Sequence, residues 1–167
     1  ALCLSGQWRV RVAPRLEERL EGFEAGRPGA DFVPVRVPGH LNLQGFGVPL
    51  YTNTAYPWDG SEQLAPPALP GDIPVAQYLC TFSLAAGWQG PGLETRLRFD
   101  GVEPAFRVWC NGQYLGYSED SFTPAEFDAT GAVRPGENLL AVEVYRWCSG
   151  SWLEDQDFWR FWGIFRD

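Results

Sequence analysis

The sequence lacks methionine and lysine altogether, and it contains a single histidine. Its thirteen cationic side chains are therefore all arginines, spread along the chain, and the formal net charge is -8. Binding to a phosphate backbone or to an anionic membrane surface requires clustered basic residues. Nucleic acids and membranes are thus not expected as partners.

Long apolar runs are absent too, since no stretch approaches the roughly 20 residues that span a bilayer. The four cysteines (Cys3, Cys80, Cys110 and Cys148) lie far apart, and none has the C-x-x-C spacing of a zinc or redox site. We expect reduced cysteines with a structural role, which favours a cytoplasmic location.

Methionine is missing even from position 1, and the last residues form an aromatic run typical of the middle of a strand. Both features predict a piece excised from a longer protein. At 167 residues the piece has the length of one domain and can bury a core of its own. We expect residues 1–167 to form a single domain.

Nineteen glycines and fourteen prolines separate short runs of alternating polar and apolar residues, a pattern typical of a β-sandwich. The runs that we expect to be strands are residues 7–13, 77–84, 93–99 and 139–147. Residues 106–110 and 113–117 flank Asn111-Gly112, which predicts a hairpin with a type I′ turn. Only residues 14–22 have a helical composition, and we expect one turn of helix there at most.

The closing stretch SWLEDQDFWRFWGIFRD carries three acids, Glu154, Asp155 and Asp157. On an extended strand Asp155 and Asp157 would point to one side, with their Cα atoms roughly 6.5–7 Å apart. That spacing alone is compatible with a catalytic pair, but nothing around it supplies the burial that raises a carboxyl pKa. The alternatives are a cation site, which needs oxygen ligands, and ion pairs with Arg160 and Arg166.

Three segments carry a resemblance to a known family. They are VPGH…QGFGVPLYTNTAYPWD, FDGVEPAFRVWCNGQYLGYSEDSFTPAEFD and RPGENLLAVEVYRWCSGSWLEDQDFWRFWGIFRD, in this order. Together they resemble the N-terminal domain of glycoside hydrolase family 2, and above all the large bacterial β-galactosidases. The resemblance implies an all-β fold, a jelly-roll β-sandwich of the galactose-binding-domain-like type, packed on a (β/α)8 barrel further along the chain. His40 and Leu41 depart from the pattern, since the family more often has Asn and Trp there.

The same resemblance implies two site residues. Asp157, the second Asp of the EDQD motif, would ligate a monovalent cation and contact the galactose 6-hydroxyl. Asn53, of the YTN motif, would hydrogen-bond the sugar, although by itself it would be interpreted as a turn residue. The cation would be Na⁺, with Mg²⁺ as a further candidate in the parent protein, and the fragment alone is not expected to bind either tightly. The two catalytic glutamates of the family lie in the barrel, so no catalytic residue is expected here.

We therefore expect the accessory domain of a retaining β-galactosidase that forms a homo-oligomer and is completed by the parent's catalytic barrel. The fragment alone should be inactive. An aspartate beside the 6-position would repel the carboxylate of a glucuronide, which favours a galactoside as substrate. Three alternatives remain open: a free-standing carbohydrate-binding module, the same domain from a β-glucuronidase or β-mannosidase, and a structural domain in a catalytically inactive relative. Trp58, Trp88 and Trp152 lie in expected loops, where they would stack on sugar rings or, more often, pack against the neighbouring domain.

Overall fold

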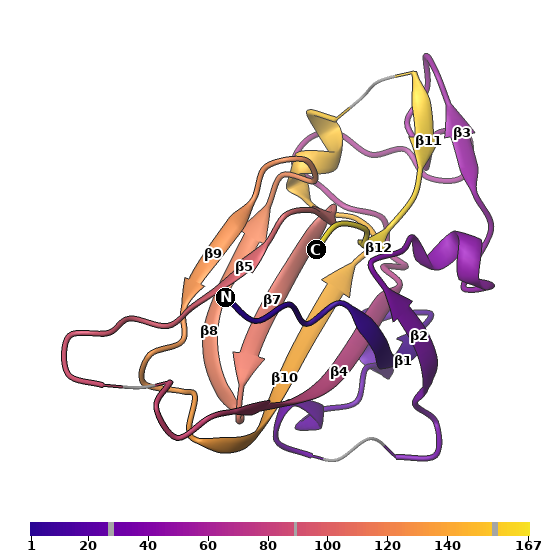
Figure 1. The fold of residues 1–167 in the computed structure, drawn as a ribbon. Helices are drawn as coiled ribbons and strands as arrows, with labels where there is room; N and C mark the ends of the chain where they lie inside the picture. The colour runs from indigo at the N-terminus through magenta and orange to yellow at the C-terminus, as the bar shows by residue number, and fades with distance from the viewer. Residues whose placement is uncertain (27–28, 89, 155–156) are drawn as a thin grey trace.

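The computed structural model describes residues 1–26, 29–88, 90–154 and 157–167. Antiparallel strands dominate these residues (Figure 1). The strands are β1 (Gly6–Ala13), β2 (Val33–Val37), β3 (Leu50–Thr52), β4 (Val75–Leu84), β5 (Arg96–Phe99), β6 (Val102–Glu103), β7 (Ala105–Cys110), β8 (Gln113–Glu119), β9 (Ala125–Asp128), β10 (Gly136–Tyr145), β11 (Phe158–Arg160) and β12 (Gly163–Ile164). Short 3₁₀ helices interrupt the loops: η1 (Leu16–Glu18), η2 (Phe23–Ala25), η3 (Leu41–Gln44) and η4 (Ser149–Trp152). Within the described residues, no helix has the length and apolar character needed to cross a bilayer.

The larger layer is a six-stranded sheet in the order β2-β1-β4-β10-β7-β8. Its central strands β4 and β10 pair over their whole length, from Gly136 opposite Leu84 to Tyr145 opposite Val75. Both faces of β10 are largely buried, as its apolar composition on both sides predicts. The sequence prediction of residues 139–147 thus identified the strand, which begins three residues earlier and ends two residues earlier.

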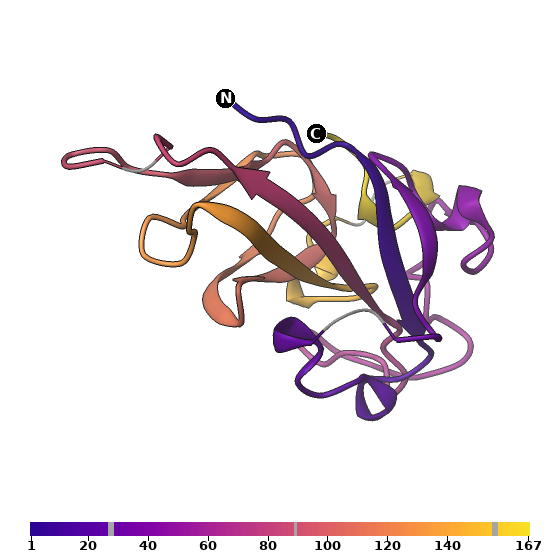
Figure 2. The ribbon, with the colours of Figure 1, turned by 60° about the horizontal axis from the view of Figure 1, so that its bottom comes forward.

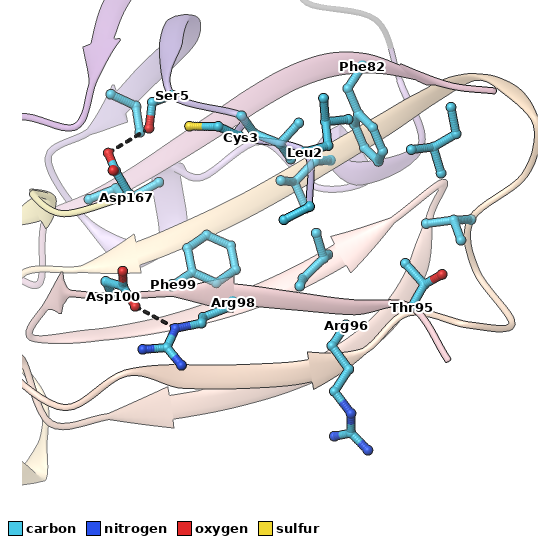
Figure 3. A pocket seen from close by; sticks show the side chains of 18 of the residues that line it. Leu2, Cys3, Ser5, Phe82, Thr95, Arg96, Arg98, Phe99, Asp100 and Asp167 are labelled. Carbon is cyan, nitrogen blue, oxygen red and sulfur yellow. Dashed lines mark hydrogen bonds and ion pairs between the residues drawn. The ribbon is translucent and has the colours of Figure 1, made fainter. Parts of the chain in front are cut away.

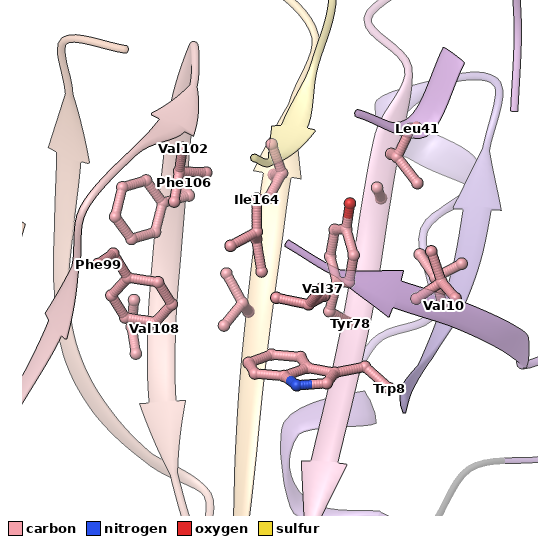
Figure 4. Packing of buried hydrophobic residues seen from close by; sticks show 14 of the residues in the cluster. Trp8, Val10, Val37, Leu41, Tyr78, Phe99, Val102, Phe106, Val108 and Ile164 are labelled. Carbon is pink, nitrogen blue, oxygen red and sulfur yellow. The ribbon is translucent and has the colours of Figure 1, made fainter. Parts of the chain in front are cut away.

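The second layer consists of the small antiparallel pairs β5–β9 and β6–β12, and the main core lies between the layers. Figure 4 shows Trp8 and Tyr78 of the large sheet near Ile164 of β12, with Phe99 and Phe106 at the other end. These side chains are almost completely buried, and each such burial contributes about 1.5–3 kcal/mol to stability. Two antiparallel layers around one core confirm the predicted all-β jelly-roll sandwich.

The other face of the large sheet is covered by the segment that carries η1 and η2 (Figure 2). Phe23 and Phe32 pack there against Leu79 and Ala141. The single turn of 3₁₀ helix at Leu16–Glu18 agrees with the prediction of at most one helical turn in residues 14–22.

The predicted hairpin is confirmed. Asn111 and Gly112 both have positive φ, +51° and +80°, between β7 and β8, as a type I′ turn requires. The Asn111 side chain also accepts a hydrogen bond from the backbone N–H of Leu139 at 2.9 Å and donates to Asn138 at 2.8 Å. The turn is therefore tied to the start of β10 as well as to its own strands.

The closing aromatic run differs from the single strand that its composition predicts. It is split into β11 and β12, which pair with different partners, β3 and β6. Gly163 lies at the start of β12 with φ +115°, a conformation that side-chain-bearing residues rarely adopt. Trp162 and Ile164 are buried in the core, each with 1% exposure, so this part of the run packs inside the domain. Trp159 remains half exposed.

Gly163→Ala is expected to destabilise the domain by about 2 kcal/mol, because it combines backbone strain with overpacking. A methyl group at this position would lie 2.8 Å from the Tyr78 hydroxyl and 3.2 Å from Cγ of Leu41. Urea unfolding of the 167-residue chain measures the loss. Gly131→Ala is the matched control, because a methyl group there meets nothing within 4 Å. Equal unfolding midpoints for the two variants would contradict the prediction.

Candidate functional site

A two-stranded ribbon brings the two predicted site residues together. Strands β3 and β11 pair antiparallel, with Tyr51 opposite Trp159 and Thr52 opposite Phe158. Asn53 directly follows β3 and Asp157 directly precedes β11, so both residues lie immediately beyond the Thr52–Phe158 pair. Residues separated by more than a hundred positions in the sequence thus become neighbours at one end of the ribbon, which projects beside the sandwich (Figure 1).

The outer face of the ribbon is exposed. Because side chains alternate between the faces of a strand, Tyr51 and Trp159 point to the side opposite Thr52 and Phe158. Tyr51 and Trp159 are each about half exposed, their ring centroids are 5.6 Å apart, and Asp157 is exposed beside them. The Tyr51 hydroxyl donates a hydrogen bond to Oδ1 of Asp157, and this bond raises the pKa of the hydroxyl above its usual value.

Asn53 begins the turn that follows β3, and its side chain is exposed. Its Oδ1 atom accepts hydrogen bonds from the backbone N–H and the hydroxyl of Thr54, at 2.6 Å and 3.3 Å. Local bonds of this kind are what a turn asparagine makes. They occupy the carbonyl oxygen and leave the amide N–H groups as the donors that Asn53 can offer to a ligand.

The inner face of the ribbon is held by Arg160, which is buried to 4% exposure. Its guanidinium donates to the Thr52 hydroxyl at 3.3 Å, donates to the backbone carbonyl of Glu154, and lies 4.4 Å from the centre of the Phe158 ring. The Glu154 carboxylate accepts instead from the Ser121 hydroxyl at 2.9 Å. Arg160 thus reaches Glu154 through its backbone carbonyl, while the Glu154 carboxylate bonds Ser121.

The ion-pair alternative also involved Asp155 and Arg166. Asp155 lies outside the described residues. Arg166 donates to the backbone carbonyl of Phe122 at 3.2 Å, and its guanidinium lies over the Phe165 ring. Sequence reasoning had treated Arg160 and Arg166 alike, because spacing alone does not reveal which arginine is buried.

Next to the ribbon, the buried Glu103 and the half-buried His40 form an ionisable pair that was not predicted from the sequence. Glu103 of β6 has 6% exposure, and its Oε2 atom is 3.8 Å from Nδ1 of His40, whose ring stacks between Phe161 and Phe165 at centroid distances of 4.6 Å and 4.9 Å. Burial raises the pKa of Glu103 to about 8, with the negative charge of Glu154 adding to the rise, and burial lowers the pKa of His40. Both groups are therefore neutral near pH 7.

The tryptophans that were candidates for sugar stacking are packed instead. Trp58 and Trp152 have 3% and 9% exposure, and their rings meet at 4.8 Å together with Tyr56. The indole N–H of Trp152 donates to the backbone carbonyl of Ala68 at 2.8 Å. Trp88 packs against a satellite core cluster. These contacts lie within the domain itself, whereas the sequence had suggested sugar stacking or packing against a neighbouring domain.

The donor set at the end of the ribbon fits part of a cation site. The described residues contain no group of three His, Cys, Asp or Glu side chains arranged to hold a metal. Asp157 nevertheless offers an exposed carboxylate, and hard monovalent or divalent cations prefer such oxygen ligands. A single carboxylate requires further ligands from another part of a protein, from water or from the substrate.

A separate cavity of about 410 Å³ lies under the N-terminal segment, between β4 and β5. Figure 3 shows Leu2, Phe82 and Phe99 around it, while the guanidinium groups of Arg96 and Arg98 point away from these apolar side chains. The Ser5 hydroxyl donates to Asp167 at 2.8 Å near its margin. Of the described residues that line the cavity, none belongs to β3 or β11. This cavity and the ribbon are thus distinct, and the ribbon carries the polar side chains Asn53 and Asp157.

Comparison with known proteins gives the family. Residues 3–167 match the model described as "Glycosyl hydrolases family 2, sugar binding domain". The chain is 49% identical over 166 residues to the β-galactosidase of Priestia megaterium and 50% identical over 166 residues to that of Halalkalibacterium halodurans. Each alignment covers 98% of this chain but 16% of the relative, so the chain spans about a sixth of the length of these relatives.

Solved structures give the same fold. A β-glucuronidase from Ruminococcus gnavus, in complex with uronic deoxynojirimycin, superposes with a TM-score of 0.60 at 23% identity, over 86% of this chain and 21% of that one. The β-glucuronidase of Faecalibacterium prausnitzii superposes with a TM-score of 0.59 at 25% identity, over 85% of this chain and 20% of that one. At such identities the likeness concerns the fold alone. The chain belongs to the sugar-binding domain family of the family 2 glycosyl hydrolases.

Proposed function

We propose that residues 1–167 are the N-terminal, substrate-positioning domain of a retaining β-galactosidase whose catalytic barrel lies elsewhere in a longer chain. Two observations support this. Two bacterial β-galactosidases have 49% and 50% sequence identity to this chain, over 98% of its length. Asn53 and Asp157 are also next to each other at the exposed end of one ribbon, and this adjacency is the structural observation that carries the proposal.

The role of each side chain follows from its chemistry. Asp157 is exposed and anionic, so it would hold a monovalent cation together with oxygen ligands from the barrel and from the 6-hydroxyl of the sugar. The cation, when bound, supplies positive charge that fixes a sugar hydroxyl. Asn53 would donate its amide N–H to another sugar hydroxyl. Both residues thus orient the galactosyl group, and holding a substrate in reactive geometry is itself a large part of catalysis.

The described residues of this domain support positioning better than chemistry. A retaining glycosidase uses two carboxyl groups about 5–5.5 Å apart, one on each side of the scissile bond. Asp157 is bonded to Tyr51, and Glu154 is engaged by Ser121, so these two acids already have structural partners. The family resemblance assigns the nucleophile and the acid/base to the barrel.

The substrate class follows from charge. A glucuronide would bring its carboxylate against Asp157, and like charges in a partly desolvated pocket repel by several kcal/mol. A neutral 6-hydroxyl suits an aspartate with a cation. β-Galactosides are thus preferred over β-glucuronides.

The full-length protein is expected to hydrolyse nitrophenyl β-galactoside at least about a hundredfold faster, in kcat/KM, than the matching β-glucuronide, since about 2.7 kcal/mol of repulsion suffices for that ratio. Its activity should rise when sodium replaces choline at constant ionic strength. Preference for the glucuronide or the mannoside would overturn the substrate class. The 167-residue chain is the control and should hydrolyse none of them. Calorimetric binding of galactose by this isolated chain at millimolar affinity would favour a free-standing module instead.

A further inference from the structure

The Tyr51 side chain contacts Asp157 diagonally across the ribbon. Tyr51 pairs with Trp159 across the ribbon, and Asp157 lies two residues before Trp159. Diagonal neighbours of this kind share one face of a ribbon and lie within reach of long or aromatic side chains. The hydrogen bond from the Tyr51 hydroxyl to Oδ1 of Asp157 realises this diagonal contact.

The Tyr51 ring is itself supported. It lies 5.6 Å from the ring of Trp159, which stacks on Phe161 with 6.3 Å between centroids and 18° between planes. Phe161 in turn stacks on His40 at 4.6 Å. A row of ring contacts therefore runs from Tyr51 through Trp159 and Phe161 to the half-buried His40, and it supports one side of the tyrosine ring.

An exposed aspartate rotates freely unless something holds it, and ordering such a side chain on binding lowers affinity. A bond from a supported tyrosine removes that freedom before any ligand arrives. It also distinguishes the two carboxylate oxygens, because Oδ1 accepts the hydrogen bond from the Tyr51 hydroxyl and Oδ2 remains for a ligand.

We propose that Tyr51 is a positioning residue that fixes the Asp157 carboxylate so that its second oxygen faces the cation and the sugar. The inference rests on the proposed role of Asp157. It adds a specific residue, a specific atom and a reason for the exposed tyrosine in this ribbon.

Tyr51→Phe in the full-length protein tests the proposal. Calorimetric titration with galactose, at several sodium concentrations with choline balancing the ionic strength, should require about tenfold more sodium for half-maximal galactose affinity. In hydrolysis, KM for a β-galactoside should rise by a larger factor than kcat falls, because ground-state ordering of the site is what is lost.

Tyr114→Phe is the matched control. Tyr114 is an exposed tyrosine on β8, 52% accessible and beside Trp109, so it undergoes the same chemical change away from the ribbon. It should leave the sodium titration unchanged. The thermal midpoints of both variants should agree within about a degree, which separates positioning from a loss of folding.

A double-mutant cycle with Asp157→Asn distinguishes the two levels of inference. Because asparagine keeps an oxygen that Tyr51 can reach, the cycle also includes Asp157→Ala: if Tyr51→Phe has the same effect with aspartate and with alanine at position 157, the tyrosine does not act through Asp157 and the positioning role is wrong. If Asp157→Asn abolishes the sodium response while Tyr51→Phe leaves it at the original value, only the inference about Tyr51 falls. If Asp157→Asn itself changes nothing, the proposed function falls.

Discussion

Asp157→Asn in the full-length protein should lower kcat/KM for a β-galactoside roughly 10²- to 10³-fold and remove the stimulation by sodium. The substitution keeps the shape of the side chain and an oxygen that Tyr51 can still reach, but it removes the negative charge. Truncating one partner of a close charge pair costs about 2–5 kcal/mol, and each 1.36 kcal/mol is a factor of ten in rate.

Initial rates across a sodium titration, at constant ionic strength, measure both parts of this result. Asp72→Asn provides the control, because Asp72 forms an exposed ion pair with Arg15 at 2.9 Å, and such surface pairs contribute little. That variant should retain activity within about twofold. A normal sodium response in Asp157→Asn would remove the cation role from this domain.

Glu103→Gln is expected to change how the stability of the 167-residue chain depends on pH. Burial raises the pKa of Glu103 from 4.5 to about 8, so between these values the folded state binds a proton that the unfolded state releases. The stability that this protonated group contributes is full below pH 4.5 and is lost as the pH rises through 8. Glutamine resembles the protonated carboxyl, so the variant should be more stable than the parent at pH 8.5, by on the order of 3 kcal/mol.

The groups that face Glu103 sharpen this measurement. They are His40, Glu154 and Arg160, and His40 titrates in the opposite sense, since its lowered pKa removes stability as the pH falls below 6.5. The difference between parent and variant in urea unfolding, measured from pH 5 to pH 9, isolates the glutamate. For Glu126→Gln, at an exposed site on β9, the free energy of unfolding should depend on pH in the same way as that of the parent. A flat difference for Glu103→Gln would show that this carboxyl is already ionised in the folded domain.

Local sequence signals were sufficient for much of the sandwich. Alternation identified β1, β4 and β10, and Asn111-Gly112 identified the hairpin and its turn, because these signals act between near neighbours. The pairing of β3 with β11 could not be predicted. Leu50–Thr52 and Phe158–Arg160 are three residues long, and no short-range pattern relates positions more than a hundred residues apart.

The buried charges escaped prediction for a different reason. Charged residues are usually exposed, so an arginine in an acidic, aromatic stretch and a glutamate before a proline are both interpreted as surface residues. Arg160 is buried because it bonds the backbone carbonyl of Glu154 and the Thr52 hydroxyl while lying over an aromatic ring. Such compensation depends on the assembled structure. Asn53 and Asp157 were identified through family resemblance, and their adjacency emerged only with the fold.

The last two strands serve different parts of the domain, since β11 belongs to the ribbon and β12 to the core. Between Asp157 and Ile164 the chain first exposes a carboxylate and then, within seven residues, buries Trp162 in the core of the sandwich. We expect a chain that fails to insert this indole also to misplace the aspartate, because the two residues lie close together in the sequence. Misfolding of this segment should therefore abolish sugar binding rather than change the sugar specificity.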